Sequence, residues 1–289
     1  GYLYVTVERR VTREVPVEVQ WTGSAPEGYM SDRENSTLDY TTVTATGPES
    51  VMEQIEKAVI SVDLTDQRES ISQSFRYTLC NGDGEPVDAQ LVTTNVEEIQ
   101  LDVRIQKVKD ITLTYGIVDG GGATAANAKV TLSAESVRVC GSEMAVDALG
   151  DELVVGTINL AELTKSGSLV FPVVLPEGIT NLTGVTEVTA AVQLSGLATR
   201  EFTLEHITSV NIPEGMTVEL ITEKLTVVVR GPTELMNKLT AEDIVASVNF
   251  EGAETGTTTF RADITFAEAF AGVGVLRAEP VSAVVAPAK

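Results

Sequence analysis

Histidine and cysteine, the residues that most often provide nucleophiles and metal ligands, are scarce in this chain. The 289 residues include one histidine, His206, and two cysteines, Cys80 and Cys140. A site with several histidine ligands cannot form, and two thiolates are too few for a four-thiolate zinc site. Any Ser-His-Asp catalytic triad or Cys-His catalytic dyad would have to use His206. Alternation over residues 202–207 instead predicts a partly covered strand position for this histidine.

The two cysteines are 60 residues apart, and neither has a histidine nearby in the sequence. A nucleophilic thiolate needs a basic neighbour, so we expect free or buried thiols. A disulfide between Cys80 and Cys140 would require neighbouring segments of the chain to fold onto each other.

Two glycine-containing segments have some features of ligand loops. Counting from Asn81, the sixth and twelfth places of a calcium loop fall on Pro86 and Val92, whereas the motif needs glycine and glutamate there. The glycine run at residues 120–122 is followed by no P-loop lysine. Both segments are predicted to be hairpins or inter-strand loops. The sequence predicts no catalytic residue, no cofactor and no metal site.

The charge balance excludes several classes of partner. Acidic residues outnumber basic ones by 42 to 20, which gives a formal net charge of −22. Nucleic acids and anionic lipid headgroups need clustered Lys and Arg, so we expect no nucleic-acid partner, and phosphate-rich ligands are disfavoured. No small-molecule ligand is predicted either. A carboxylate hydrolase would need an acidic pair across a concave site, but the pairs at 97–98 and 242–243 are read as solvated surface.

The elements that surround these residues recur three times along the chain. Each recurrence has a strand that ends in a glycine, a short helical pattern, and a second strand that ends in Asp or Asn. The glycines are Gly47, Gly141 and Gly231, which lie 94 and 90 residues apart, and Asp63, Asn159 and Asn249 follow them by 16, 18 and 18 residues. The predicted domains are residues 1–106, 107–199 and 200–289, the second of which is the most divergent.

Each unit is predicted to be mainly β with one short helix. Alternating pairs such as Val227 and Val229 indicate half-buried strands. The glycine is expected to end the strand and let the backbone turn. A proline and a glutamate then suit a helix start, and Val51 with Ile55 is expected to form the buried stripe of the first helix.

Two further groups of residues could have either a functional or a structural role. At Asp63, Asn159 and Asn249, an exchange between Asp and Asn does not suit acid–base chemistry, so we expect a strand-end side chain that bonds its own backbone. Three aromatic residues of the first unit are candidates for partner contact or for core packing, and the sequence does not decide between these roles: Trp21, Tyr29 and Tyr40.

These positions resemble the YbbR-like repeat. In that pattern a β-run enters (Arg)-Gly-(Pro/Ser), a short helix follows, and the unit continues into Ile-x-Ala-x-Val-Asp-Leu-Ser. Residues 229–232 read Val-Arg-Gly-Pro and residues 244–250 read Ile-Val-Ala-Ser-Val-Asn-Phe. Residues 60–65 read Ile-Ser-Val-Asp-Leu-Thr. The second of the three predicted domains departs most from the family pattern, with Cys140 before its glycine. The later Leu-Pro-x-Gly element resembles residues 175–178.

The resemblance implies three tandem β-rich repeats arranged in line and a regulatory role without catalysis. Members are usually tethered to the cell membrane by a single N-terminal helix, with their repeats on the extracytoplasmic side, and the best known regulate an integral-membrane diadenylate cyclase that makes cyclic di-AMP. By this resemblance we expect that cyclase as the partner, the first repeat as the contact, and a membrane helix before residue 1. Residues 1–7 are expected to form a strand. The alternative is an extracellular adhesin-like or cell-wall-binding spacer array.

Overall fold

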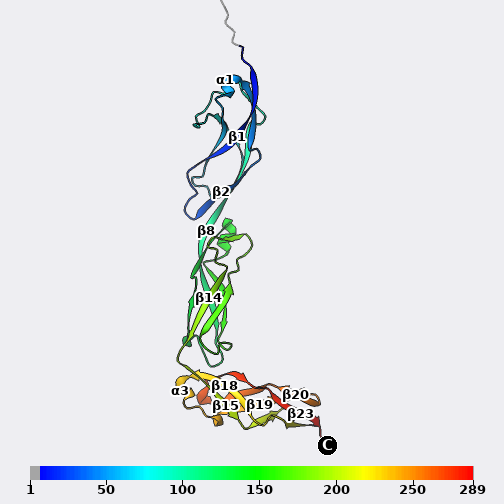
Figure 1. Ribbon diagram of the computed structural model, residues 1–289. Helices are drawn as coiled ribbons and strands as arrows, with labels where there is room; N and C mark the ends of the chain where they lie inside the picture. Colours follow the sequence, from blue (N-terminus) through cyan, green and yellow to red (C-terminus); the bar gives the residue numbers. More distant parts are fainter. Residues whose placement is uncertain (1–6, 289) are drawn as a thin grey trace, which may run out of the picture. The chain divides into compact units, whose positions relative to one another are not determined.

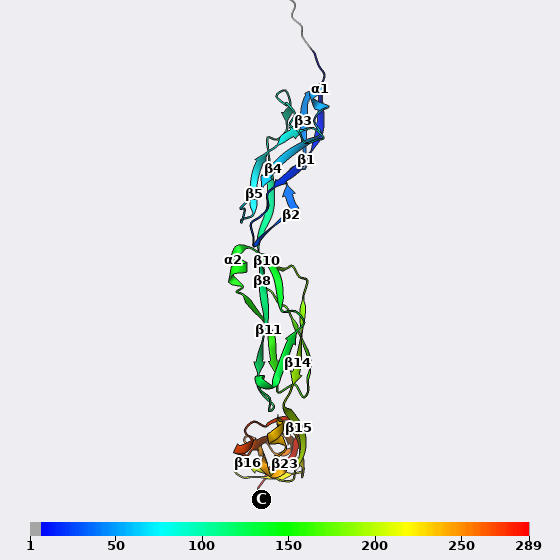
Figure 2. The ribbon, with the colours of Figure 1, turned by 90° about the vertical axis from the view of Figure 1, so that its left-hand side faces the viewer.

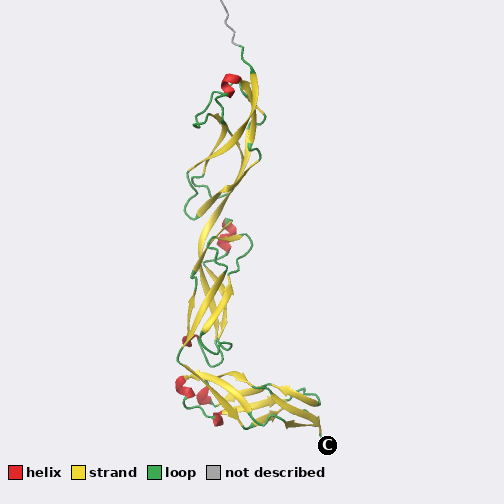
Figure 3. Cartoon of the chain, viewed as in Figure 1, coloured by secondary structure: helices red, strands yellow, loops and turns green. Residues whose placement is uncertain are grey.

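The structure is a computed structural model that describes residues 7–288 and divides into two compact units. Among the described residues, the first unit comprises 7–111, Val137–Asp151 and Leu175–Gly184, and the second comprises Thr112–Ser136, Glu152–Val174 and 185–288. Strands predominate in both units and the helices are short (Figure 1, Figure 3). This confirms the mainly β fold class. The strand expected at the start of the chain falls almost entirely on residues 1–6, outside the described residues.

The long strand β8 (Glu98–Val118) contributes residues to both units. The other elements of the first unit are mostly short strands, and α1 and α2 are its helices: β1 (Arg10–Thr22), β2 (Tyr29–Leu38), β3 (Thr42–Pro48), α1 (Glu49–Met52), β4 (Lys57–Asp63), β5 (Ile71–Arg76), β6 (Thr78–Cys80), β7 (Thr93–Thr94), β10 (Ser136–Gly141), α2 (Glu143–Ala148) and β13 (Ile179–Asn181).

The second unit has the same character, with α3 and three short 3-10 helices. Its elements are η1 (Ala125–Asn127), β9 (Ala128–Leu132), β11 (Glu152–Asn159), β12 (Gly167–Pro172), β14 (Glu187–Leu194), β15 (Leu197–Leu204), β16 (Ile207–Val210), β17 (Met216–Leu220), β18 (Leu225–Pro232), α3 (Thr233–Met236), η2 (Ala241–Asp243), β19 (Ile244–Asn249), β20 (Gly256–Phe260), β21 (Ala262–Phe266), η3 (Glu268–Phe270), β22 (Gly274–Ala278) and β23 (Val281–Pro287).

One pattern of strand pairing recurs three times. Strand β1 pairs antiparallel with β3 and parallel with β4. Strand β8 pairs with β10 and, in parallel over Thr112–Val118, with β11. Strands β15 and β16 pair with β18 and β19 in the same senses as β1 with β3 and β4. Each set also contains a central strand paired on both sides. In the first set β8 pairs with β2 and β5 as part of a six-stranded sheet, and in the others the three strands form sheets of their own, β9–β14–β12 and β17–β23–β20. We call the three sets the first, second and third repeats.

The two junctions between repeats differ in their backbone. Strand β8 runs for 21 residues, so it closes the first repeat and opens the second without a break. Between β14 and β15 the chain passes through Ser195 and Gly196, and Gly196 has a φ of +72°. A left-handed glycine interrupts the extended backbone, and the strand therefore ends at this junction.

The signature glycines have a different role from the one expected. Gly47, Gly141 and Gly231 lie within β3, β10 and β18, and none of them has a positive φ. A Cβ atom on these glycines would lie 2.8 Å from Val92 Cγ2, 2.6 Å from the Gly178 carbonyl oxygen and 2.9 Å from Val273 Cγ2, respectively. The expectation that they let the backbone turn is wrong, because what requires glycine is the close approach of a following segment.

The helices are also shorter than the sequence suggested. Helices α1 and α3 have four residues each, so Ile55 lies beyond the end of α1 and the expected helical stripe does not form. The residues buried at the ends of these helices are Met52 and Met236. A single helical turn has no room for two residues spaced four apart on one face.

Candidate functional site

The recurring Asp or Asn forms the same turn in every repeat. Oδ1 of Asp63 accepts a hydrogen bond from the backbone N–H of Thr65 at 2.9 Å. Asn159 Oδ1 accepts from Ala161 N–H at 3.1 Å, and Asn249 Oδ1 accepts from Glu251 N–H at 2.9 Å. In each case the side chain bonds the backbone two residues further on, which ends the strand in a tight turn.

Asp63 gives this turn a pH dependence. Hydrogen bonds from the Thr65 hydroxyl and backbone N–H hold the pKa of Asp63 below its usual range. A lowered folded-state pKa stabilises the fold above the unfolded pKa of about 3.9, and this contribution is lost as the pH falls through the folded value. The midpoint of thermal unfolding is therefore expected to fall less steeply between pH 5 and 2 for Asp63→Asn than for the parent chain. The matched variant Asn159→Asp should gain a pH dependence in the same range, and equal profiles for all three proteins would contradict this account.

The three aromatic candidates occupy different environments in the first unit. Trp21 and Tyr29 are half-buried against the core of the first repeat, and the Arg33 guanidinium lies 5.9 Å from the Trp21 ring centroid. Tyr40 is 41% exposed. The Tyr29 hydroxyl donates to Glu143 Oε1 of α2 at 2.7 Å. Tyr29 therefore contacts another repeat of its own chain, while Tyr40 lies at the surface.

Further polar contacts hold α2 beside β8 within the first unit (Figure 2). Lys107 Nζ lies 2.6 Å from Asp147 Oδ1 and 3.6 Å from Glu143 Oε1. The hydrogen bond to Asp147 is the main cause of the raised pKa of Lys107. Lys109 reaches Asp151 at 2.7 Å. Such partly exposed pairs contribute little to stability individually, so they orient α2 more than they hold the fold together.

A more substantial contact joins the second and third repeats inside the second unit. Arg230, on β18, is 1% exposed. Among the described residues it is the one charged residue that is buried. Its Nε donates to the Gly121 carbonyl at 2.8 Å, its Nη2 donates to the Gly120 and Leu160 carbonyls at 3.1 and 2.7 Å, and its Nη1 donates to Leu163. Burial lowers the pKa of Arg230, but an arginine side chain stays protonated in proteins. Four backbone carbonyls of one repeat thus enclose a cation that belongs to the next.

The glycine run at residues 120–122 provides half of this contact. Gly120 and Ala123 exchange both backbone hydrogen bonds, at 3.0 and 3.1 Å, so the expected hairpin is present. A Cβ on Gly122 would lie 1.8 Å from the Arg230 carbonyl oxygen. The sequence reading missed this partnership. The signals available were an arginine before Gly231 and a glycine run 110 residues earlier in the chain.

The side chains that could act as nucleophiles, bases or metal ligands do not gather in one place. Cys80 and Cys140 are free and buried, and burial raises the pKa of both thiols. His206 lies exposed between β15 and β16, so the expected strand position is wrong. The ladder of β15 ends at Leu204 and that of β16 begins at Ile207, because the chain crosses there from one sheet to another. In residues 7–288, no three His, Cys, Asp or Glu side chains gather as a metal site would require.

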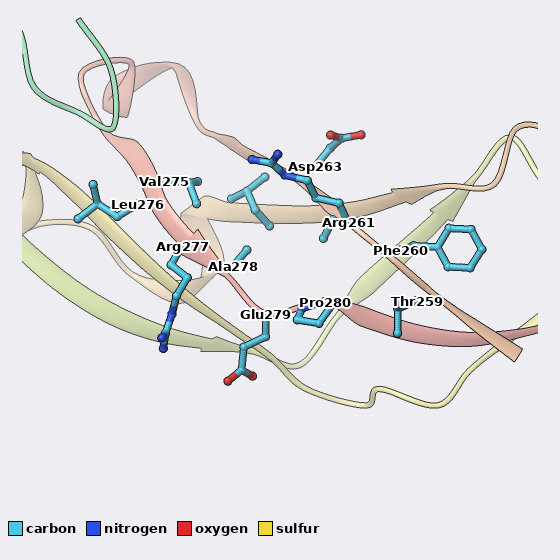
Figure 4. Close-up of a pocket in the computed structure, with 12 residues that line it drawn as sticks. Thr259, Phe260, Arg261, Asp263, Val275, Leu276, Arg277, Ala278, Glu279 and Pro280 are labelled. Atoms are coloured by element: carbon cyan, nitrogen blue, oxygen red, sulfur yellow. The ribbon is translucent and has the colours of Figure 1, made fainter. Parts of the chain in front are cut away.

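A groove of about 750 Å³ lies between β21 and β22 in the third repeat. Its lining includes two arginines and two acids, all exposed: Arg261, Asp263, Arg277 and Glu279. Figure 4 shows the carboxylates of Asp263 and Glu279 pointing in opposite directions. They do not face one reacting centre, as the acidic pair of a glycoside hydrolase would.

Within the described part of the chain, no helix combines the length and apolar composition that crossing a bilayer would require.

Comparison with known proteins agrees with the arrangement in repeats. The family model described as YbbR-like protein matches residues 15–106 and 202–268. The CdaA regulatory protein CdaR of Bacillus subtilis (strain 168) is 26% identical over 261 residues, which are 87% of this chain and 52% of the relative. The chain therefore spans about half the length of this curated relative.

Two solved structures are also similar. The solution structure of SuR18C from Streptococcus thermophilus has 18% identity and a TM-score of 0.27, and the match covers 35% of this chain and 89% of that one. The crystal structure of a YbbR-like protein from Streptococcus pneumoniae TIGR4 has 15% identity and a TM-score of 0.23, with 68% and 100% covered. Neither superposition carries an argument about function. The family model, in contrast, matches more than half of the chain, and its two matched segments lie in the first and third repeats. The chain therefore belongs to the YbbR-like family.

Proposed function

We propose that this chain is a non-enzymatic regulatory protein that acts by contact on a membrane diadenylate cyclase, the class of enzyme that makes cyclic di-AMP. The observation that carries the proposal is the 26% identity to CdaA regulatory protein CdaR, which extends over 87% of the chain. The matched region takes in most of the chain, so the likeness extends beyond one local motif.

The chemistry of the chain supports contact as the mechanism. The groove of the third repeat has acids that point apart, and both thiols are buried. A net charge of −22 disfavours nucleic acid and anionic lipid as partners. A protein that binds one conformation of an enzyme more tightly than another shifts its activity without chemistry of its own.

The proposal places the chain on the extracytoplasmic side of the cell membrane, held by a single helix that precedes residue 1. The first repeat would then be nearest the membrane. Tyr40, exposed in that repeat, is the first residue to test as a partner contact.

Association is the direct test of this proposal. The full-length protein and the diadenylate cyclase of the same host are co-expressed, and the cyclase is captured from solubilised membranes. We expect co-purification that survives deletion of the third repeat and is weakened by Tyr40→Ala, with Tyr40→Phe as the matched control. If the cyclase is captured in folded form without the chain, the regulatory proposal fails and the spacer array becomes the better account.

A further inference from the structure

Strand β11 of the second repeat lacks a neighbour that its counterparts have. In the first repeat β6 pairs antiparallel with the outer edge of β4, and in the third repeat β21 pairs in the same way with β19. Strand β11 occupies the equivalent place in the second repeat, since it carries Asn159 and is parallel to β8. Among the described residues no strand pairs with its outer edge.

The sequence explains the vacancy. Sixteen residues separate β5 from β7 in the first repeat, and thirteen separate β20 from β22 in the third, and these segments contain β6 and β21. Only six residues, 173–178, separate β12 from β13 in the second repeat, and they include Pro176, which has no backbone N–H. The second repeat is therefore too short at this point to supply its own covering strand.

The outer edge of β11 has backbone groups that no strand of the described residues pairs with. Leu160 N–H donates to the Val118 carbonyl at 2.9 Å, so Leu160 faces β8. Successive residues of a parallel strand address opposite neighbours, and Thr157 therefore turns its N–H and C=O to the open side. Unpaired groups of this kind on an edge strand are a template for another strand.

The surroundings of the edge indicate what would fit it. Val154 on β11 and Val170 on β12 are 63% and 58% exposed. A hollow of about 450 Å³, whose lining includes Thr157 of β11 and Phe171 of β12, is lined mainly by apolar side chains, among them Leu163 and Leu169. Glu152 begins β11 and Glu162 follows its end, so carboxylates flank the apolar stretch. The complementary occupant is an extended segment with an apolar centre and Lys or Arg at its ends.

We propose that the outer edge of β11 is a docking site for an extended segment of the regulated partner, which adds an antiparallel strand in the place that β6 and β21 fill in the other repeats. This inference rests on the proposed function, because it assigns a second surface for that contact, in addition to the first-repeat surface tested at Tyr40. Main-chain pairing provides the affinity, and the apolar hollow with its flanking carboxylates provides the selectivity.

The test compares three variants of the full chain for binding to the diadenylate cyclase in nanodiscs. Thr157→Pro removes an outward N–H while it leaves the β8 ladder intact, and it should weaken binding about tenfold because a main-chain bond is lost and the ring blocks pairing. Thr157→Val keeps the N–H and should bind like the parent. Glu152→Lys reverses a flanking charge and should also weaken binding, and it serves as the second variant if Thr157→Pro alters the circular dichroism spectrum.

Hydrogen–deuterium exchange on the same complex locates the contact. The peptide that covers residues 153–159 should become protected when the cyclase is bound. Binding without protection there, or unchanged by Thr157→Pro and Glu152→Lys, overturns the docking site but leaves the regulatory role standing. No binding by the parent chain defeats the proposed function itself. A dimer of the chain alone that Thr157→Pro dissociates would show that a second copy occupies the edge, and it would overturn the proposal.

Discussion

Replacement of Arg230 by alanine is expected to be among the most damaging single changes in the second unit. The guanidinium is 1% exposed and donates to four carbonyls of the preceding repeat. Its removal leaves those part-buried and buried carbonyl acceptors without their donor, and a buried polar group left unsatisfied costs about 1–3 kcal/mol. The expected result is a lower thermal midpoint together with faster amide exchange at residues 120–123, measured on the intact chain.

Chemical rescue separates this explanation from simple loss of packing. Free guanidinium, at concentrations far below denaturing ones, should partly restore the midpoint of Arg230→Ala because the carbonyl cage remains. The matched control is Arg200→Ala, whose lost bonds are to Met236 and Leu239 within the third repeat and whose side chain also packs on Phe202. Arg230→Lys should remain impaired, since one ammonium cannot reach four carbonyls with the fork geometry of arginine. A normal midpoint for Arg230→Ala would contradict the assigned role.

Gly122→Ala is expected to have the second large effect, at the other side of the same contact. Gly122 has a φ of +73°, and its Cβ would lie 1.8 Å from the carbonyl oxygen of Arg230. Left-handed backbone costs a residue with a side chain about 1–2 kcal/mol, and overpacking against backbone that cannot yield adds about 1–3 kcal/mol.

The control for this change is Gly252→Ala. Gly252 has nearly the same φ, +71°, but nothing lies within 4 Å of its Cβ position. It therefore pays the backbone cost without the clash, and urea unfolding should show a clearly smaller loss for this variant than for Gly122→Ala. Equal losses would mean that the approach of the glycine hairpin to β18 does not contribute to stability.

These contacts also show where sequence reasoning succeeds. The turn at Asp63, Asn159 and Asn249 was predictable because it joins residues only two apart, and its recurrence at regular intervals identified the repeats. Alternation predicted strands such as β4, in which Ala58, Ile60 and Val62 are buried. Both signals are local, so they can be recognised in the sequence without knowledge of tertiary contacts.

The features that escaped prediction depend on distant partners. The buried state of Arg230 follows from carbonyls as much as 110 residues away, and no local pattern marks an arginine as enclosed. Gly47, Gly141 and Gly231 were assigned to turns because a glycine at a strand end usually serves one, whereas the true constraint comes from Val92, Gly178 and Val273. The open edge of β11 became visible only when three sets of strand pairings could be compared.

The most direct test of the regulatory role is the rate of cyclic di-AMP formation by the membrane-embedded diadenylate cyclase, measured against increasing concentrations of the folded chain. A folded protein of similar size and negative charge that lacks these repeats serves as the control. The account predicts a rate that changes and saturates with the chain but not with the control, because binding shifts the cyclase between conformations. A rate that stays constant at every concentration, with both proteins folded, would contradict it.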